Sequence, residues 1–337
     1  MRTLQIPALI LCLFATSCAT KVGARHMAPA RFDVGGIRRL AVAGFRSSEW
    51  GSERWAGRIR DGVESSLSSG GFFELVDGAP EVRADAEAGG DGDWEWRRWG
   101  RIHGADGVLA GTVSVTTSER RDTKRHTEKV KTGRHRNEYY TEGGVKKVRR
   151  VEIVEERVEF IPILERNAQI DVAVALLDVK TGGRVAYERY TEDRSREAEG
   201  EDDIRRMDDG GEMLGELAAQ IVPRISNDLQ PHEVVERLKL SSKSGCEEGV
   251  KLARDGDWDA ARDFWRALIA SDPDNDAAYY NLGVAAEVAG DFEEADERYL
   301  NALEIRGRGL YRKALDRVGD KIEAAERLKG QLLGRDE

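Results

Sequence analysis

Residues 104–115, GADGVLAGTVSV, place a glycine-containing turn directly before an apolar run, which predicts the entry into a buried strand. Two similar apolar runs precede it, at residues 37–45 (IRRLAVAGF) and 72–77 (FFELVD). The stretches between these runs have helical spacing, carried by Trp55, Ile59, Val63 and Leu67 and then by Trp96 and Trp99. The order strand, helix, strand, helix, strand predicts an α/β layer in which helices pack on a sheet.

The pattern continues with two further strands and a helix. Alternating apolar residues on one strand face are Ile170, Val172, Val174 and Leu176. A turn at residues 180–183 (KTGG) then predicts an antiparallel return around residues 185–190. Residues 211–229 have the apolar spacing of a helix. We therefore expect an α+β domain over residues 36–230, with a mixed sheet flanked by helices.

The N-terminus predicts export. After Met1 and Arg2, the apolar core at residues 8–15 (ALILCLFA) is shorter than the roughly 20 residues that span a bilayer, which is typical of a signal peptide. Residues 15–18, ATSC, resemble the lipobox of bacterial lipoproteins, which implies a signal peptide over 1–17 and acylation of Cys18, for example with palmitate. Ala19 after the cysteine implies the outer membrane, periplasmic face. The alternative is ordinary secretion with cleavage nearby.

Residues 18–35 are polar and aperiodic, and we expect a lipidated tether that reaches about 55 Å at ~3.3 Å per residue. The chain has 337 residues and a net charge of -10, which argues against nucleic-acid binding because phosphates attract a basic surface. Of the three cysteines, Cys12 and Cys18 belong to the N-terminal region. The mature chain then keeps one thiol, Cys246, too few for a disulfide framework or a cysteine-based metal site.

No pattern in the sequence predicts catalysis. The five histidines are not spaced with cysteines or carboxylates as metal ligands are: His26, His103, His126, His135 and His232. Neither a phosphate-binding loop nor a Gly-x-Ser-x-Gly motif stands between a strand and a helix. We therefore expect no enzyme, no cofactor and no metal.

A 34-residue period marks residues 242–335. Gly249 and Gly283 are one period apart, as are Trp265 and Tyr299. The pattern resembles the tetratricopeptide repeat, in which small residues let two helices approach beside large aromatic ones. Its members here are Gly249, Gly256, Ala261, Trp265, Pro273, Tyr279, Leu282, Gly283, Gly290, Ala295, Tyr299 and Ala302.

Glu248 and Gly307 depart from this repeat pattern, in which Leu and Pro are usual. We expect two repeats and a capping helix at residues 310–333. The resemblance implies a concave face that binds other proteins. The alternative is a helical buttress against the preceding domain.

Residues 37–230 also resemble a family. AVAGF (41–45), GFFELVD (71–77), GADGVLAGTV (104–113) and VALLDVKTGGRV (174–185) are similar in order and spacing to the curli-secretion (CsgG-like) lipoproteins. They are similar as well to the related activator lipoproteins of penicillin-binding proteins. The resemblance implies a mixed sheet flanked by helices, ring-shaped oligomers and hairpins inserted into the outer membrane, one of which would fall at residues 116–166.

That insert departs from the family's chemistry. Residues 120–150 hold twelve Lys or Arg and four Asp or Glu, and residues 192–216, where a second hairpin would fall, hold eleven Asp or Glu and four Arg. Membrane strands need an apolar outward face, so we predict a charged hairpin arm with its tip at residues 139–144 and no pore. The candidate interaction residues on the arm are Arg120, Arg121, Lys124, Arg125, Lys146, Lys147, Arg149 and Arg150.

Two interpretations of the arm remain, a solvated charged ribbon or a basic element that docks on an acidic partner. Segment 192–216 of a neighbouring copy would be such a partner and would give a homo-oligomer. The sequence as a whole predicts a lipid-anchored, periplasm-facing outer-membrane lipoprotein. It would act as a non-catalytic protein-binding adaptor or assembly factor, touching the membrane through its lipid only and other envelope proteins through its repeats. The alternatives are a curli-type secretion channel component and an activator of a peptidoglycan synthase.

Overall fold

The computed structural model describes residues 20–47, 51–77 and 94–333. The predicted signal peptide and Cys18 lie outside these residues. The chain forms two compact units, one of residues 31–230 and one that joins residues 1–30 to residues 231–337.

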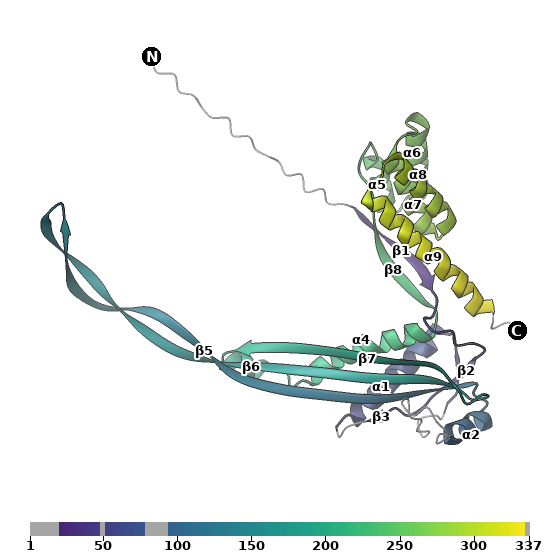
Figure 1. The fold of residues 1–337 in the computed structure, drawn as a ribbon, viewed down its shortest axis with the longest axis horizontal. Coiled ribbons are helices and arrows are strands. Elements are labelled where there is room, and N and C mark those ends of the chain that lie inside the picture. The colour runs from purple at the N-terminus through teal and green to yellow at the C-terminus, as the bar shows by residue number, and fades with distance from the viewer. Residues whose placement is uncertain (1–19, 48–50, 78–93, 334–337) are drawn as a thin grey trace, which may run out of the picture. The chain divides into compact units, whose positions relative to one another are not determined.

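The unit of residues 31–230 contains a six-stranded mixed sheet among its described residues (Figure 1). Its strands are β2 (Arg39–Val42), β3 (Arg46–Ser47), β4 (Glu74–Leu75), β5 (Gly107–Glu142), β6 (Val145–Asp178) and β7 (Arg184–Glu199). The order is β4-β2-β5-β6-β7, with β3 also beside β5. β2 pairs parallel with β4 and β5, and β3 pairs parallel with β5, whereas β6 is antiparallel to both β5 and β7. The predicted α+β class with a mixed sheet is confirmed.

Helices cover both faces of this sheet. They are α1 (Glu53–Gly70), α2 (Trp94–His103), α3 (Glu201–Arg206) and α4 (Gly211–Leu229). Strand residues with even numbers from Ile170 to Leu176 face α1 and α4, where they form the larger core with residues such as Ile59 and Ile221. The alternate strand residues form a second core with Trp96 of α2. This division follows from the period of two along a strand.

β5 and β6 continue far beyond the rest of the sheet and form a long hairpin, which we call the arm and define as residues 119–165. The two strands pair from Gly107 opposite Asp178 to Glu142 opposite Val145, with one register shift at residues 131–135. The turn is made by Gly143 and Gly144, both with positive φ (58° and 81°) that other residues rarely adopt. The tip therefore lies within the predicted residues 139–144.

Three sequence-based expectations were wrong in this unit and at the N-terminus. Residues 192–199, expected as part of an acidic segment beyond the strand of residues 185–190, form the outer half of β7 and pair with β6 from Ile170 back to Ile163. The strand expected at residues 72–77 is paired only at Glu74–Leu75, because Phe72 and Phe73 turn into the core instead. The expected tether contains strand β1 (Lys21–Ala28), which pairs antiparallel with β8 (His232–Lys239).

The second unit consists of the β1–β8 ribbon and the helices α5 (Glu247–Arg254), α6 (Trp258–Ser271), α7 (Asp276–Ala289), α8 (Phe292–Ile305) and α9 (Gly309–Leu333). Each helix packs against the next one along the chain, and β1 packs against α5, α7 and α9. Asp257, Asn275 and Asp291 start helices α6, α7 and α8 by accepting a backbone N–H with their side chains. No helix in the described part of the chain is long and apolar enough to cross a membrane.

Candidate functional site

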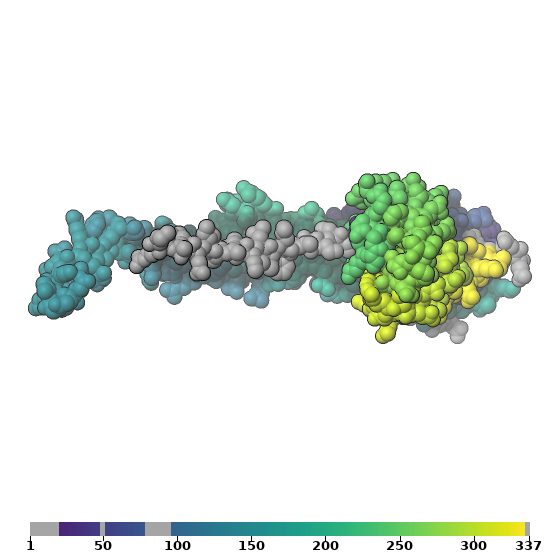
Figure 2. Space-filling model, turned by 90° about the horizontal axis from the view of Figure 1, so that it is seen from above, coloured from purple at the N-terminus to yellow at the C-terminus, as the bar shows by residue number. Residues whose placement is uncertain are grey.

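The outer part of the arm is a two-stranded ribbon that no other described residue of its unit covers. β7 ends at Glu199 opposite Ile163, so β6 has no second neighbour from there to its start at Val145. No side chain between residues 119 and 163 is buried. Figure 2 shows the far end of the arm, in teal, as a narrow rod. Both strand edges of the ribbon are therefore open to water.

Charges on the arm are divided between its strands. Residues 120–136 of β5 hold eight Lys or Arg and two Asp or Glu, whereas the opposing residues 151–165 of β6 hold one Arg and five Glu. The net charge of the whole arm is only +3, from thirteen Lys or Arg and ten Asp or Glu. The strongly basic arm inferred from residues 120–150 is thus wrong for the folded hairpin, because that range leaves out the acidic half of β6.

The predicted arm residues form two separate groups. Arg120, Arg121, Lys124 and Arg125 lie on β5 near the base, and Lys146, Lys147, Arg149 and Arg150 lie on β6 near the tip. Several of them pair within the chain: Lys124 with Glu199 (3.0 Å), Lys147 with Glu142 (2.7 Å) and Arg149 with Glu138 (2.7 Å). Exposed pairs of this kind contribute about 0–1 kcal/mol each and mainly fix the strand register.

Apolar side chains accompany the charges on the arm. Val154, Val158 and Phe160 lie on the face of β6 that carries the core residues further along the strand, and they are 47%, 40% and 66% exposed. On the same face, β5 places Arg125 and Lys131 opposite Phe160 and Val154. The face is therefore mixed: β6 carries apolar side chains interrupted by Glu156, and β5 carries cations.

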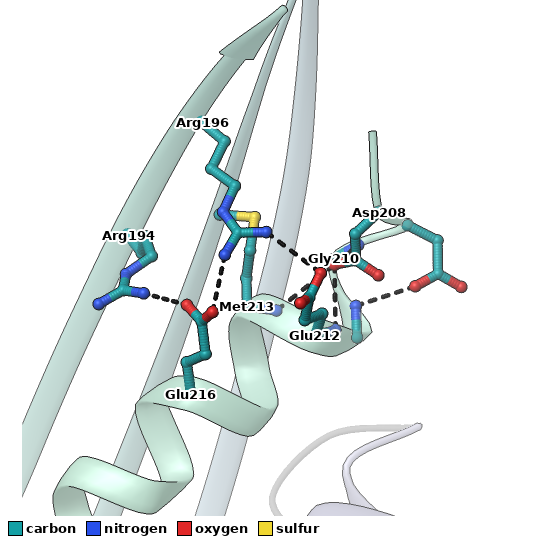
Figure 3. A network of polar contacts seen from close by, with 9 residues as sticks. Arg194, Arg196, Asp208, Gly210, Glu212, Met213 and Glu216 are labelled. Atoms are coloured by element: carbon teal, nitrogen blue, oxygen red, sulfur yellow. Dashed lines mark hydrogen bonds and ion pairs between the residues drawn. The ribbon is translucent and has the colours of Figure 1, made fainter. Parts of the chain in front are cut away.

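A network of ion pairs joins β7, the strand beside the base of the arm, to α4 (Figure 3). Arg194 and Arg196 of β7 both reach Glu216, and Arg196 also contacts Glu212 at 3.3 Å. Asp208 accepts backbone N–H groups of Gly210, Glu212 and Met213 at the start of α4. Burial opposes the charge of Asp208, but these hydrogen bonds outweigh it and lower the pKa of Asp208 below its ordinary value.

On the same face of the sheet, Arg166 of β6 is 8% exposed and donates from both Nε and Nη2 to Glu119 of β5. The sequence gives only a weak signal for such pairs, because alternating charges in β7 are equally typical of a solvated loop. Together these contacts join β5 to β6 and β7 to α4 at the base of the arm.

The residues of the 34-residue pattern lie on and between α5, α6, α7 and α8. A Cβ added at Gly249 would lie 2.3 Å from Nε1 of Trp265, and one at Gly283 would lie 2.6 Å from the ring of Tyr299. Gly290 ends α7 with φ 81°, and Gly256 lies between α5 and α6 with φ 92°. The remaining members lie in the turn before α7 or on helices: Ala261, Pro273, Tyr279, Leu282, Ala295 and Ala302.

Two buried carboxylates of α7 were not foreseen. Glu287 accepts hydrogen bonds from Tyr299 (2.6 Å), Arg317 (2.8 Å and 2.7 Å) and Lys321 (2.8 Å). Asp276 accepts one from Tyr311 at 2.7 Å. In the sequence, the signal for Glu287 was that it is the lone carboxylate among the apolar residues 277–289.

Burial raises the pKa of the neighbouring Cys246 thiol to about 12, so this thiol is not a nucleophile at neutral pH.

An open pocket of about 750 Å³ lies at the edge of the sheet where β2 and β5 begin. Its two carboxylates already bind backbone groups: Asp106 accepts the N–H of Arg39 at 2.8 Å, and Asp178 that of Thr181 at 2.7 Å. Among the described residues, no three His, Cys, Asp or Glu side chains are grouped to hold a metal ion. The pocket and the arm share no residues.

Comparisons with known proteins give one partial family match and several distant structures. Residues 247–317 match a family described as a domain of unknown function, DUF6340. No protein of curated function matches the sequence. A variant of the PelC dodecamer from Paraburkholderia phytofirmans is 15% identical over 63% of this chain and 99% of that chain, with a TM-score of 0.30.

Two further solved structures are similar at a comparable level. Lipoprotein GNA1162 from Neisseria meningitidis is 13% identical over 56% of this chain and 99% of that one, with a TM-score of 0.24. The hypothetical protein CT253 from Chlamydia trachomatis is 13% identical over 56% and 96%, with a TM-score of 0.27.

Proposed function

We propose that this chain is a lipid-anchored outer-membrane lipoprotein that faces the periplasm and acts as a non-catalytic protein-binding adaptor or assembly factor, with the arm as its binding element. The observation that carries the proposal is the outer arm, where two strands of unlike charge leave both backbone edges unpaired. The anchor is Cys18 in the lipobox-like ATSC segment.

An isolated two-stranded ribbon is at best marginally stable in water, because it buries almost nothing. Exposed strand edges also accept a further strand from another chain, with main-chain hydrogen bonds supplying affinity and side chains supplying specificity. The arm offers this edge together with Phe160, Val158 and a cationic row on the facing strand. These features favour a protein partner with an exposed strand and some acidic side chains.

The helical unit offers less free surface than the repeat resemblance implies. β1 packs on α5, α7 and α9, and Val22 and Ala24 of β1 belong to the same core cluster as the helices. A protein that binds this side must displace β1, whereas one that binds the arm displaces nothing. This difference favours the arm over the helical unit as the binding element.

Charge also favours an adaptor over a secretion channel. Arg125, Lys131 and Glu156 lie on one face of the ribbon, and Lys124, Arg157 and Glu159 lie on the other. A Lys or Arg that faces lipid at mid-depth costs about 2–4 kcal/mol, and neither face of this ribbon is free of such residues.

Site-specific photo-crosslinking in cells tests the binding role. A photoreactive residue at Phe160 is expected to form adducts with another polypeptide of the envelope. The matched control is Ile102 of α2, which is 68% exposed against 66% for Phe160. Adducts at Ile102 that equal those at Phe160, or none at Phe160, would contradict the proposal.

A variant with a shortened arm provides a second test. Removing residues 126–142 and 145–159 joins Arg125 and Phe160, which already lie opposite each other, through the native Gly143-Gly144 turn. The Lys124–Glu199 ion pair is kept. This variant should fold and lose the crosslinked partner in co-purification. Full retention of the partner would mean that the arm does not bind it. Palmitate labelling of the parent and of Cys18→Ser tests the anchor separately.

A further inference from the structure

The outward face of the β1–β8 ribbon is basic, although the chain as a whole has a net charge of -10. Val22 and Ala24 of β1 and Leu238 of β8 face the helices and are buried. The alternate residues point away from them. The exposed outward side chains are Lys21, Arg25 and Met27 on β1 and Glu233, Val235, Arg237 and Lys239 on β8.

The cations on this face gather at one end. Lys21 of β1 lies opposite Lys239 of β8 at this end. The next outward pair contains Arg237 of β8, and the pair after it contains Arg25 of β1. The single acidic residue, Glu233, lies at the other end and is 3.7 Å from Arg25. Met27 and Val235 add exposed apolar surface to the same face, at 49% and 60%. The face thus carries four cations against one anion.

The cationic end is also the end nearest to the predicted lipid anchor. Lys21 is three residues after Cys18, so the chain between them spans at most about 10 Å at ~3.3 Å per residue. Acyl chains on Cys18 would therefore hold Lys21, Lys239 and Arg237 near the level of the lipid headgroups. There is no room in three residues for the long tether that the sequence predicted.

We infer that the outward face of the β1–β8 ribbon is a docking surface for a bilayer that contains anionic lipids, placing the helical unit directly at the membrane. The inference rests on the proposed anchoring at Cys18, and it adds a second, electrostatic contact to it. Lys and Arg side chains near an anionic surface each strengthen binding by a factor of about five, and the exposed Met27 and Val235 suit the interfacial region. One lipid signal plus a basic patch is a recognised way to hold a protein stably on a membrane.

The test uses the full mature chain with Cys18→Ser, so that no acyl chain contributes. It is mixed with vesicles of phosphatidylcholine alone or of phosphatidylcholine and phosphatidylglycerol in equal parts, and bound protein is measured by sedimentation. We expect binding only to the anionic vesicles and a decrease with added salt, because exposed charges are screened. Equal binding to both vesicle types, or to neither, would overturn the inference.

Two triple variants with the same change of charge locate the surface. Lys21, Arg237 and Lys239 are replaced by Ser in the first, and Lys129, Arg134 and Arg136 of the arm in the second, all of them exposed. The ribbon variant should bind anionic vesicles roughly a hundredfold more weakly than the parent, from three factors of about five. The arm variant should bind within a few-fold of the parent. An equal loss in both would place the contact elsewhere or make it non-specific.

The two proposals fail separately. If palmitate labelling finds no lipid on Cys18 while the ribbon variant still loses vesicle binding, the anchor is wrong and the surface stands. If labelling succeeds and the ribbon variant binds as the parent does, the anchor stands and the docking surface is wrong. Circular dichroism of both variants checks that the exposed substitutions leave the fold intact.

Discussion

Gly283 lets the ring of Tyr299 lie directly on the backbone of α7. Tyr299 is fully buried, and a Cβ at residue 283 would approach two of its ring carbons at 2.6 Å. Gly249 and Trp265 repeat the arrangement one period earlier, at 2.3 Å. The glycine is therefore required by close packing and not by an unusual backbone conformation.

Gly283→Ala should lower the free energy of unfolding by about 1–3 kcal/mol, because overpacking forces the ring or the helix to move. Gly319→Ala in α9 is the control, since a Cβ there would meet no atom within 4 Å. It should raise the free energy of unfolding by about 0.5–1 kcal/mol, because alanine loses less chain entropy than glycine in a helix. Urea unfolding of both variants measures the difference, and equal signs would contradict the packing described.

Glu287 is a second residue whose substitution should change the free energy of unfolding measurably. It is 1% exposed and accepts hydrogen bonds from Arg317, Lys321 and Tyr299. Burial alone would raise the pKa of Glu287, but hydrogen bonds from Arg317 and then from Lys321 and Tyr299 outweigh it and lower this pKa. A depressed pKa in the folded state means that the ionised carboxylate stabilises the fold.

Glu287→Gln should therefore lower the free energy of unfolding by about 1–3 kcal/mol, because the partly buried Arg317 loses its charged partner and the buried Lys321 keeps only Glu236, at 2.6 Å. The stabilisation by Glu287 is fully present above the ordinary glutamate pKa of about 4.3 and is lost as the pH falls through the lowered value. The stability of the variant should accordingly decline less between about pH 5 and pH 3. Asp263→Ala, in an exposed pair with Arg266 at 3.2 Å, should cost less than about 1 kcal/mol. Similar losses in the two variants would show that Glu287 is not buried in this network.

At the scale of the element, strand β6 divides into a supported and an unsupported part. Residues 168–176 of β6 lie between β5 and β7 with helices on both faces, whereas residues 146–158 have one neighbouring strand and no cover. Hydrogen exchange follows local opening, which is frequent where little apolar surface is buried.

In dilute protein, amides of residues 168–176 should be strongly protected from hydrogen exchange and those of residues 146–158 weakly protected. If a partner or a second copy adds to the free edge, protection of residues 146–158 should rise when that partner is present or when the protein concentration increases. Protection of residues 168–176 should not change and serves as the internal control. Strong protection of the outer arm in dilute monomer would mean that the ribbon is not free.

The helices could be predicted because their signals are local. Apolar spacing from Trp55 to Leu67 predicted α1, which forms from Glu53 to Gly70. It also predicted a helix at Trp96 and Trp99, where α2 forms, and α4 at residues 211–229. β1 and β8 lack such a signal, since few of their residues turn inward and their partners are separated by about two hundred residues of sequence. The outer half of β7 was missed because its alternating charges pair with Glu216 and Glu212 of α4, a contact that only the fold creates.

The arm itself could be predicted as a charged hairpin, but not its neutralised charge. The glycine turn and the loss of apolar periodicity are visible in residues 116–144. Which residues face each other depends on the strand register, and the register places the acidic residues 152–165 opposite the basic residues 120–135. Counting charges over residues 120–150 leaves out most of the acidic segment, whereas the folded hairpin places the two segments side by side.

At the scale of the whole chain, one unit is inserted into the sequence of the other. In each unit, the segments next to the two crossing points contact each other. Ala28 pairs with His232 across the β1–β8 ribbon, and Gln331 of α9 holds both backbone groups of Ala30 at 2.9 Å and 3.0 Å. In the inserted unit, Phe32 donates its backbone N–H to Asp228 at 3.0 Å, and Arg31 contacts Glu188 at 2.6 Å. The two boundaries between the units, at residues 30/31 and 230/231, therefore do not divide a hydrophobic core.

This topology predicts that the units fold independently. Joining Ala30 to Pro231 through a short Gly/Ser linker should give a helical protein with cooperative unfolding, because the linker only has to close a hairpin whose strands are already paired. Residues 31–230 alone should keep the mixed sheet. Circular dichroism and urea unfolding of each piece, compared with the intact chain, measure this. The decisive control is Ala24→Asp in the linked piece, which puts a charge where β1 packs on the helices and should lower its stability by several kcal/mol. If the linked piece is unfolded, or if Ala24→Asp leaves it unchanged, β1 is not part of the helical core and the ribbon would not hold that unit near the anchor.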